Sequence, residues 1–323
     1  MVRGASGESA EQCDGTGLVA FPVLILELEM HIGYFADGPW SHCALDQILS
    51  NKTFSVRFIC ARFDNPDQIL KEKAATAGIP FFIHSDINSS EFLEEIKKFD
   101  CDLFVSMSFN QIFKERIINL SPGGIVNCHA GKLPFYRGRN VLNWALINDE
   151  TEFGVTVHYV DSGVDTGDIV KQQCYSISDL DTYETLLARS YDYCAEVLYQ
   201  SLLEVASGQA QRIPQATIHS VGFYCSQRKV GDENINWMQY SREIFNFVRA
   251  ICKPGPEARA FIGSNEVKVN KVEMVPEAPI YKGIPGAVIG IESGNLFVKT
   301  SDSFVKLVEW TSDTKVRVGD RFQ

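Results

Sequence analysis

The sequence has little of what a membrane or nucleic-acid-binding protein needs. None of its apolar runs approaches the roughly 20 residues that a helix needs to cross a bilayer. The longest, 18–28, is interrupted by Pro22 and Glu27. Basic residues are the minority, 30 Lys and Arg against 41 Asp and Glu, which gives a formal net charge of −11. This balance predicts neither a membrane partner nor a nucleic-acid partner.

Paired cysteines are also missing. The nine cysteines are scattered along the chain, and none forms a C-x-x-C pair. Several lie in apolar runs, as Cys60 does in 56–61. This usage is typical of buried, reduced thiols in a cytoplasmic protein. We therefore expect a cytoplasmic location and no bound metal.

The composition is that of a globular protein, with 45% hydrophobic and 22% charged residues. A chain of 323 residues is longer than one usual domain, so we expect two. The first 17 residues mix Gly, Ser, Glu and Asp without any periodicity. We predict that residues 1–29 form a disordered extension.

An alternating pattern starts at Met30. Helical stretches such as 67–78 and 90–99 separate several apolar runs that are short enough for buried strands: 32–36, 56–61, 80–84, 103–107, 125–128 and 155–160. The alternation predicts an α/β domain with a Rossmann-like, mainly parallel sheet and helices on both faces. A long helix with one apolar stripe follows and ends before 207–208, so this domain is assigned to 30–208.

The pattern changes after a linker that closes at Pro214. A predicted helix over 241–252 is followed by short β-rich runs, which Gly, Pro, Asn and Asp separate: 266–272, 286–291, 296–300 and 304–310. This rhythm is typical of a small antiparallel barrel or sandwich. We therefore predict a small C-terminal β-rich domain over 216–323.

The polar residues with the clearest chemistry lie in two segments. Asn127 and His129 are two apart at the end of a predicted strand, so their side chains point to the same side. A carboxamide can stabilise an oxyanion and an imidazole can move a proton, which suits acyl transfer. In the second segment, 160–168, glycines bracket Asp165 on a loop after a strand. A carboxylate near an imidazole stabilises its charged form.

The Asn-x-His of 127–129 and the Asp-Thr-Gly of 165–167 together resemble the signature of the folate-dependent formyltransferases. That family includes methionyl-tRNA formyltransferase, glycinamide ribonucleotide transformylase and the sugar-nucleotide N-formyltransferases. The resemblance extends from His31 to about Leu203, and the segments 37–42 and 106–113 look most like the sugar-nucleotide branch.

The C-terminal part is similar to the C-terminal domain of methionyl-tRNA formyltransferase-like proteins. The matching segments are 236–237, 244–250 and 286–288. The resemblance implies an OB-like barrel for this domain.

The resemblance implies transfer of a formyl group from 10-formyltetrahydrofolate to a primary amine. His129 is then the general base, Asn127 the donor to the oxyanion, and Asp165 the carboxylate that orients His129. The pterin of the cosubstrate is expected to bind against the segments 109–113 and 161–165, largely through their backbone groups. The predicted cosubstrate residues are Ser108, Phe109, Asn110, Gln111, Phe113, Asp161 and Val164.

The acceptor that the resemblance implies is an amino-deoxysugar nucleotide, as used in glycan biosynthesis such as that of O-antigen. Lys132, Arg137 and Arg139 lie within eight residues of one another and could together bind a pyrophosphate, although each could also be a solvated charge on a loop. Trp40 could stack on a base or sugar, or pack in its loop. The predicted acceptor residues are Asp37, Gly38, Trp40, Lys132, Arg137, Arg139 and Asn140.

Other functions stay open at this point. A tRNA acceptor is the main alternative, but residues 205–323 carry 15 basic and 12 acidic residues, and the basic ones are spread singly. A hydrolase that releases formate from the same folate, or a folate binder without activity, would use the same scaffold. The small C-terminal domain, if it binds no tRNA, is free to form a dimer surface, so we expect a homodimer.

Overall fold

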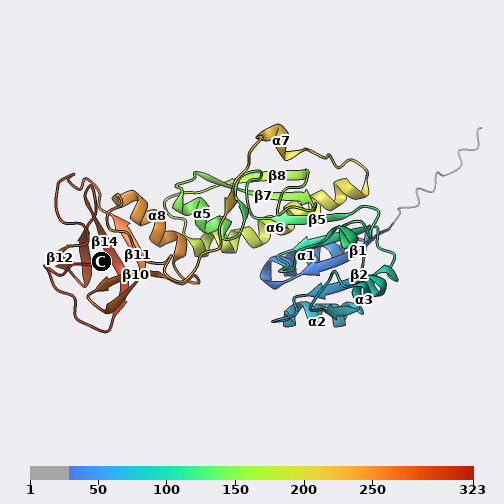
Figure 1. The fold of residues 1–323 in the computed structure, drawn as a ribbon, viewed down its shortest axis with the longest axis horizontal. Coiled ribbons are helices and arrows are strands. Elements are labelled where there is room, and N and C mark those ends of the chain that lie inside the picture. Colours follow the sequence, from blue (N-terminus) through green and yellow to red (C-terminus); the bar gives the residue numbers. More distant parts are fainter. Residues whose placement is uncertain (1–28) are drawn as a thin grey trace, which may run out of the picture.

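The computed structural model describes residues 29–323; apart from Glu29, the extension predicted over 1–29 lies outside the described residues (Figure 1). Seven strands form the first sheet, in the order β3-β2-β1-β4-β5-β7-β8. Their bounds are β1 Met30–Ala36, β2 Phe54–Ala61, β3 Phe81–Ile83, β4 Leu103–Met107, β5 Ile125–His129, β7 Glu152–Tyr159 and β8 Ile169–Ser176. The six strands expected in this domain are all present, and β8 is an additional one.

The sheet is mainly parallel, as predicted. β1 to β5 pair in parallel, whereas β7 runs antiparallel to β5 and to β8. β4 is buried at every position, which is why it appears in the sequence as an unbroken apolar run. β7 lies beside β5 in a register that sets His158 directly opposite Asn127.

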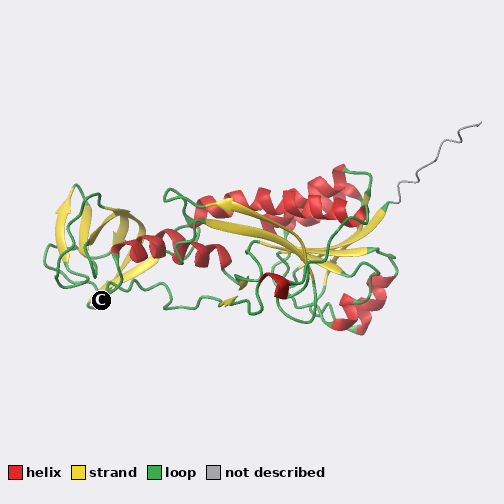
Figure 2. Cartoon of the chain, turned by 90° about the horizontal axis from the view of Figure 1, so that it is seen from above, coloured by secondary structure: helices red, strands yellow, loops and turns green. Residues whose placement is uncertain are grey.

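Helices cover both faces of this sheet (Figure 2). α1 (Gly38–Ser50) packs along α6 (Tyr183–Ala206), and both share a core with Ile32 and Tyr34 of β1. α3 (Ser90–Lys97) and α4 (Glu115–Ile118) share a second core with Phe35 and Phe58. The remaining helices of this part are α2 Gln68–Ala77 and α5 Val141–Ile147.

The C-terminal part is a five-stranded antiparallel sheet in the order β10-β11-β14-β13-β12. The bounds are β10 Ala258–Ile262, β11 Asn265–Met274, β12 Val288–Glu292, β13 Asn295–Lys299 and β14 Phe304–Ser312. α8 (Ser241–Ile251) buries Ile244 and Val248 and contacts both this sheet and α5. It therefore connects the two sheets (Figure 1).

The connection between α6 and α8 runs back over the first sheet. Ile213 pairs with Ile169 of β8 through two backbone hydrogen bonds, and the short helix α7 (Gln215–Ile218) follows. β9 (Tyr224–Cys225) then pairs in parallel with β6 (Arg137–Gly138), which belongs to the loop after His129. The end of the predicted linker and the first residues assigned to the C-terminal domain thus lie against the segment with the candidate catalytic residues.

Candidate active site

Asn127, His129 and Asp165 lie together in the structure. Asn127 and His129 belong to the last residues of β5, and Asp165 is on the loop after β7. The Oδ2 atom of Asp165 lies 3.7 Å from Nδ1 of His129, and its Oδ1 atom lies 3.4 Å from Nε2 of His158. The backbone N–H of Gly138 donates to Oδ2 at 2.8 Å. One carboxylate therefore faces two imidazoles.

The partners of the two histidines indicate which ring nitrogens carry protons. Nε2 of His129 lies 2.7 Å from the carbonyl oxygen of Tyr136, which can only accept, so Nε2 carries the proton. Nδ1 is then the basic nitrogen and faces Asp165. Nδ1 of His158 donates to the Tyr159 carbonyl at 2.8 Å in the same way, and Nδ2 of Asn127 lies 3.2 Å from its Nε2.

The Asp165 carboxyl is strongly acidic for a buried group. Burial on its own would raise its pKa, but the nearby His129 and His158 and the Gly138 N–H outweigh it, so its pKa lies well below the usual range. Asp165 is therefore ionised at neutral pH. A fixed negative charge therefore lies beside Nδ1 of His129, the ring nitrogen that is free to accept a proton.

A cavity of about 430 Å³ opens on this constellation, and we call it the Asn127 cavity. All of the residues predicted for the cosubstrate line it: Ser108, Phe109, Asn110, Gln111, Phe113, Asp161 and Val164. Asn127, His129, His158 and Asp165 line it as well, together with two arginines, Arg62 and Arg139.

Several side chains of the Asn127 cavity are engaged with the protein itself. Gln111 accepts from the N–H of Ile87 and donates to the carbonyl of His84, and Phe113 is buried in the second core. Asp161 accepts from Gly163 N–H and from the Thr166 hydroxyl. These side chains shape the wall, which leaves backbone groups for a ligand.

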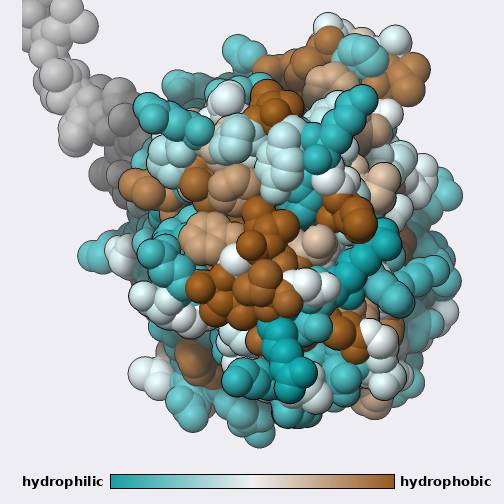
Figure 3. Space-filling model, turned by 90° about the vertical axis from the view of Figure 1, so that its left-hand side faces the viewer, coloured by the Kyte–Doolittle hydropathy of each residue, from teal (hydrophilic) through white to brown (hydrophobic). Residues whose placement is uncertain are grey.

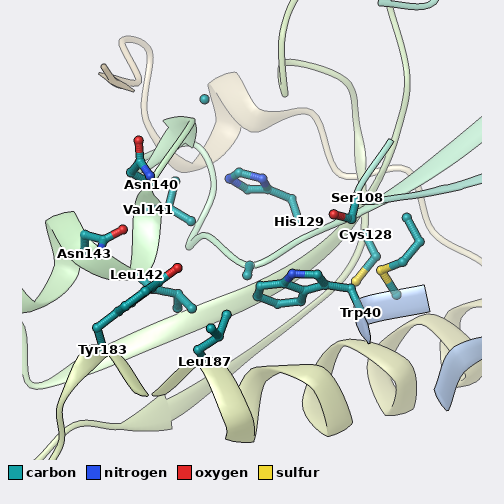
Figure 4. Close-up of a pocket in the computed structure, with 13 residues that line it drawn as sticks. Trp40, Ser108, Cys128, His129, Asn140, Val141, Leu142, Asn143, Tyr183 and Leu187 are labelled. Atoms are coloured by element: carbon teal, nitrogen blue, oxygen red, sulfur yellow. The ribbon is translucent and has the colours of Figure 1, made fainter. Parts of the chain in front are cut away.

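A second cavity, of about 270 Å³, lies on the other side of His129, and we call it the Trp40 cavity. Figure 4 shows Tyr183 and Leu187 of α6, Trp40 of α1 and Asn140 arranged around it, with the His129 ring at its edge. Val141, Leu142 and Asn143 complete much of the remaining wall. Four residues line both cavities: Ser108, Cys128, His129 and Gly138.

The structure does not bring the seven predicted acceptor residues together. Trp40 and Asn140 line the Trp40 cavity, whereas Arg139 lines the Asn127 cavity. Lys132 forms an ion pair with Glu152, and the Arg137 guanidinium donates twice to Gln215. Neither of these two side chains lines the two cavities, so the three cations do not form one clamp in this structure.

Asp37 lies between β1 and α1, and Gly38 is the first residue of α1. The Asp37 carboxylate accepts from Arg62 at 3.3 Å, and Gly38 donates its N–H to Asp67 at 3.1 Å. Burial raises the pKa of Asp37 in spite of Arg62. Neither residue lines the two cavities, and both contribute to the shape of the turn that presents Trp40.

The position of His158 in the middle of a predicted strand favours a role in the core or in support of the site over one in catalysis. His158 is 2% exposed and contacts both Asn127 and Asp165. The Tyr136 carbonyl was not predicted from the sequence, because a backbone carbonyl leaves no mark in the residue types. The wall formed by α5 and α6 was not predicted either, because packing of the folded chain brings it to the site.

Family models match both parts of the chain. The model described as formyl transferase matches residues 34–202, which is just over half of the chain. The model described as formyl transferase, C-terminal domain, matches residues 228–319. The chain belongs to the formyl transferase family. It is an enzyme of that family.

Solved structures are similar to this formyltransferase at low sequence identity. WlaRD, a sugar 3N-formyl transferase, shares 20% identity, with 89% of this chain and 99% of that chain covered and a TM-score of 0.65. The N-formyltransferase from Helicobacter canadensis shares 21% identity over 88% of this chain and 100% of that chain, with a TM-score of 0.65. A sugar N-formyltransferase from Shewanella sp. shares 19% identity over 76% and 99%, with a TM-score of 0.61. These similarities show the fold.

Two further observations concern residues 29–323 of the enzyme. Within this range, His, Cys, Asp and Glu side chains form no group of three or more that could hold a metal ion. The helices of the same range are too short or too polar to span a bilayer.

Proposed function

We propose that this formyltransferase transfers the formyl group of 10-formyltetrahydrofolate to the primary amine of an amino-deoxysugar nucleotide. The observation that carries the proposal is the pair of cavities that meet at His129. One holds the polar constellation and the residues predicted for the cosubstrate, and the other offers a separate space for an acceptor. A transfer between two ligands needs such an arrangement.

In this proposal Asn127, His129 and Asp165 all act on the reaction at the formyl carbonyl of the cosubstrate. The acceptor amine attacks the formyl carbon, and Nδ1 of His129 takes the amine proton, because Nε2 already donates to Tyr136. The Asp165 carboxylate, 3.7 Å from Nδ1, stabilises the imidazolium. Asn127 donates an amide N–H to the oxyanion of the tetrahedral intermediate. The bond between the formyl carbon and N10 of the folate then breaks, N10 takes the proton from His129, and tetrahydrofolate and the N-formyl product are released.

The Asn127 cavity receives the folate in this proposal. Its wall offers backbone groups of 108–113 and of the 161–165 loop, since the side chains of Gln111 and Asp161 are already bonded within the protein. WlaRD was solved in the presence of dTDP and 5-N-formyl-THF, and the Helicobacter canadensis enzyme with folinic acid and dTDP-3-aminofucose. Those ligands support a folate cosubstrate and a dTDP-linked amino sugar here.

The Trp40 cavity receives the sugar. Apolar side chains of Val141, Leu142 and Leu187 suit the methyl and ring faces of a deoxysugar, whereas Asn140 offers an amide to its polar groups. Arg139, in the adjoining cavity, is the predicted cation that stays available for the diphosphate.

A tRNA acceptor is the alternative that the C-terminal domain keeps open. Binding to several phosphates would need a clustered basic surface, and the 15 Lys and Arg of residues 205–323 are offset by 12 Asp and Glu. This balance supports the sugar nucleotide. We also propose that the enzyme is cytoplasmic and takes part in glycan biosynthesis.

The test is an acceptor panel with 10-formyltetrahydrofolate. The panel contains dTDP-, UDP- and GDP-linked amino-deoxysugars and methionyl-tRNA, each at low and high salt. We expect turnover with a sugar nucleotide that changes little with salt. Turnover with methionyl-tRNA alone, suppressed steeply by salt, would replace the sugar proposal. Formate release without any acceptor would instead support a hydrolase.

Substitutions test the catalytic assignments. N127A, H129A and D165A should each lower kcat by about 10²-fold or more while the chain stays folded. D168N is the matched control, because Asp168 lies on the same loop but does not line the two cavities. If H129A kept the wild-type kcat at neutral pH, His129 would not be the base.

A further inference from the structure

Gln215 is the only residue of α7 whose side chain is buried, and it reaches the loops around Asp165. Its side chain, 4% exposed, donates from Nε2 to the carbonyl of Asp165 and to the carbonyl of Gly167, both at 2.9 Å. Its Oε1 atom accepts from Nε and Nη2 of Arg137 at 3.1 and 2.6 Å. Both amide protons and both lone pairs of this side chain are therefore in use.

The orientation of this amide follows from its partners. A guanidinium can only donate and a carbonyl can only accept, so Oε1 must face Arg137 and Nε2 must face Asp165 and Gly167. Glutamine is the natural residue with this combination at this length. A carboxylate would keep the contact with Arg137 and lose both donors.

The two segments held by Gln215 are those that fix the catalytic geometry. Arg137 lies between Tyr136, whose carbonyl accepts from His129, and Gly138, whose N–H donates to Asp165. Asp165 has a positive φ of 54°, which is unfavourable for a residue with a side chain and persists only where the surroundings enforce it. Gln215 bonds to the carbonyl of this same residue.

The connection that carries Gln215 is itself anchored on both sides. Ile213 pairs with Ile169 before it, and β9 pairs with β6 after it. Gly222 also passes so close to Pro134 that an added Cβ would lie 2.2 Å from the Pro134 carbonyl oxygen. The segment that carries Gln215 is therefore anchored to β8 before it and to the 134–138 loop after it.

From these contacts we propose that Gln215 is a positioning residue of the formyl transfer. It fixes the Asp165 loop against the loop that carries the Tyr136 carbonyl, and so sets the relation between Asp165 and the His129 ring. This inference rests on the proposed roles of His129 and Asp165. Small displacements of catalytic groups cost large factors in rate, so the effect belongs in kcat.

The kinetic test uses the full-length chain with Q215A and Q215E. Both variants should lower kcat by about tenfold or more, with the KM of each substrate within about threefold of wild type. Q215E is the more specific test, because its carboxylate still accepts from Arg137 but places an oxygen, in place of the amide donor, against the carbonyls of Asp165 and Gly167. The matched control is Q172A: Gln172 also donates from Nε2 to a backbone carbonyl, that of Leu133, and does not contact the Asp165 loop.

Hydrogen–deuterium exchange of the same proteins gives a readout that needs no substrate. In Q215A and Q215E, amides of 136–139 and 161–168 should exchange faster than in wild type, whereas in Q172A these amides should keep wild-type rates. An inactive wild-type enzyme with this exchange pattern would overturn the proposed function but not the coupling of the two loops.

Three results would overturn the inference. The first is wild-type kcat in folded Q215E. The second is a loss confined to the KM of the sugar nucleotide, which would make Gln215 act on binding through Arg137. The third is unchanged exchange of the two loops in both Gln215 variants. If Q215A fails to fold, Q215E, which keeps the side-chain length, still decides among these results.

Discussion

At the scale of single residues, Asp165, which we propose as a catalytic carboxylate, also contributes to the stability of the folded chain. Its carboxyl is buried, yet His129, His158 and the Gly138 N–H hold its pKa well below the ordinary value of 3.8. A group whose pKa is lowered by folding stabilises the folded chain above its unfolded pKa. That contribution decreases as the pH falls through the interval between the unfolded and the folded value.

We therefore predict that the free-energy difference in unfolding between wild type and D165N depends on pH. It should be largest at neutral pH and should shrink as the pH is lowered below about 4. Chemical unfolding of both proteins between pH 3 and 7 measures it, with D168N as control. A difference that grows towards acid pH would contradict the assignment of Asp165 as an ionised partner of the two histidines.

The residues of the site differ in how far the sequence could predict them. Asn127 and His129 belong to one strand, and the spacing of two dictates a common side, so their proximity follows from local geometry. Lys132 and Arg137 are predicted either to bind a pyrophosphate or to be solvated loop charges, and in the structure their side chains pair with Glu152 and Gln215. Gln215 lies 78 positions after Arg137, and such a contact is visible only in the folded chain.

At the scale of elements, α8 depends on a buried arginine where it meets the first domain. Arg249 is 5% exposed and donates from Nη1 to the carbonyls of Ser178 and Asp181, at 2.7 and 3.2 Å. Burial lowers its pKa. Asn143 of α5 also donates to the Ala250 carbonyl of α8, so polar contacts join helix and domain.

R249M should destabilise the chain by about 1–3 kcal/mol, because it keeps most of the side-chain volume and leaves two carbonyls without their donor. Chemical unfolding monitored by circular dichroism measures this loss. R317M is the control, since Arg317 is exposed and its replacement should change stability by less than about 0.5 kcal/mol. Equal stability of R249M and R317M would show that these contacts contribute nothing.

The elements were predicted well where burial is uniform. β4 has the predicted bounds, and β1, β2, β5 and β7 contain nearly all of their predicted runs. β8 was missed because it lies at the edge of the sheet and carries Lys171, Gln172 and Gln173, which hide its apolar start. β6 and β9 have two residues each and exist only because they pair with each other.

At the scale of the whole molecule, the C-terminal part and the catalytic part are not independent. The connection after α6 supplies Gln215 and β9 to the candidate active site. The homodimer stays a prediction. Figure 3 shows apolar side chains gathered at the end of the molecule formed by the C-terminal sheet. In the connection between β11 and β12 of this sheet, Ile280 and Ile284 are exposed. Sedimentation of the full-length enzyme tests whether two copies associate.

A chain that ends at residue 209 should lose activity even where it remains soluble. The truncation removes Gln215, β9 and the face of α8 that covers α5, so kcat should fall by about 10²-fold or more. Steady-state kinetics with the acceptor that the panel identifies measures the change, and circular dichroism establishes that the shortened chain is folded. A folded, shortened chain with the wild-type kcat would show that the catalytic domain is self-sufficient.

The two cavities that share Ser108, Cys128, His129 and Gly138 have a consequence for the order of events in one catalytic cycle. If donor and acceptor occupy separate chambers with a common wall, neither has to leave before the other enters. The reacting group then crosses directly from one bound molecule to the other. Such an enzyme has no turnover when only one chamber is occupied. An inhibitor that resembles the acceptor would therefore block the reaction without displacing the donor.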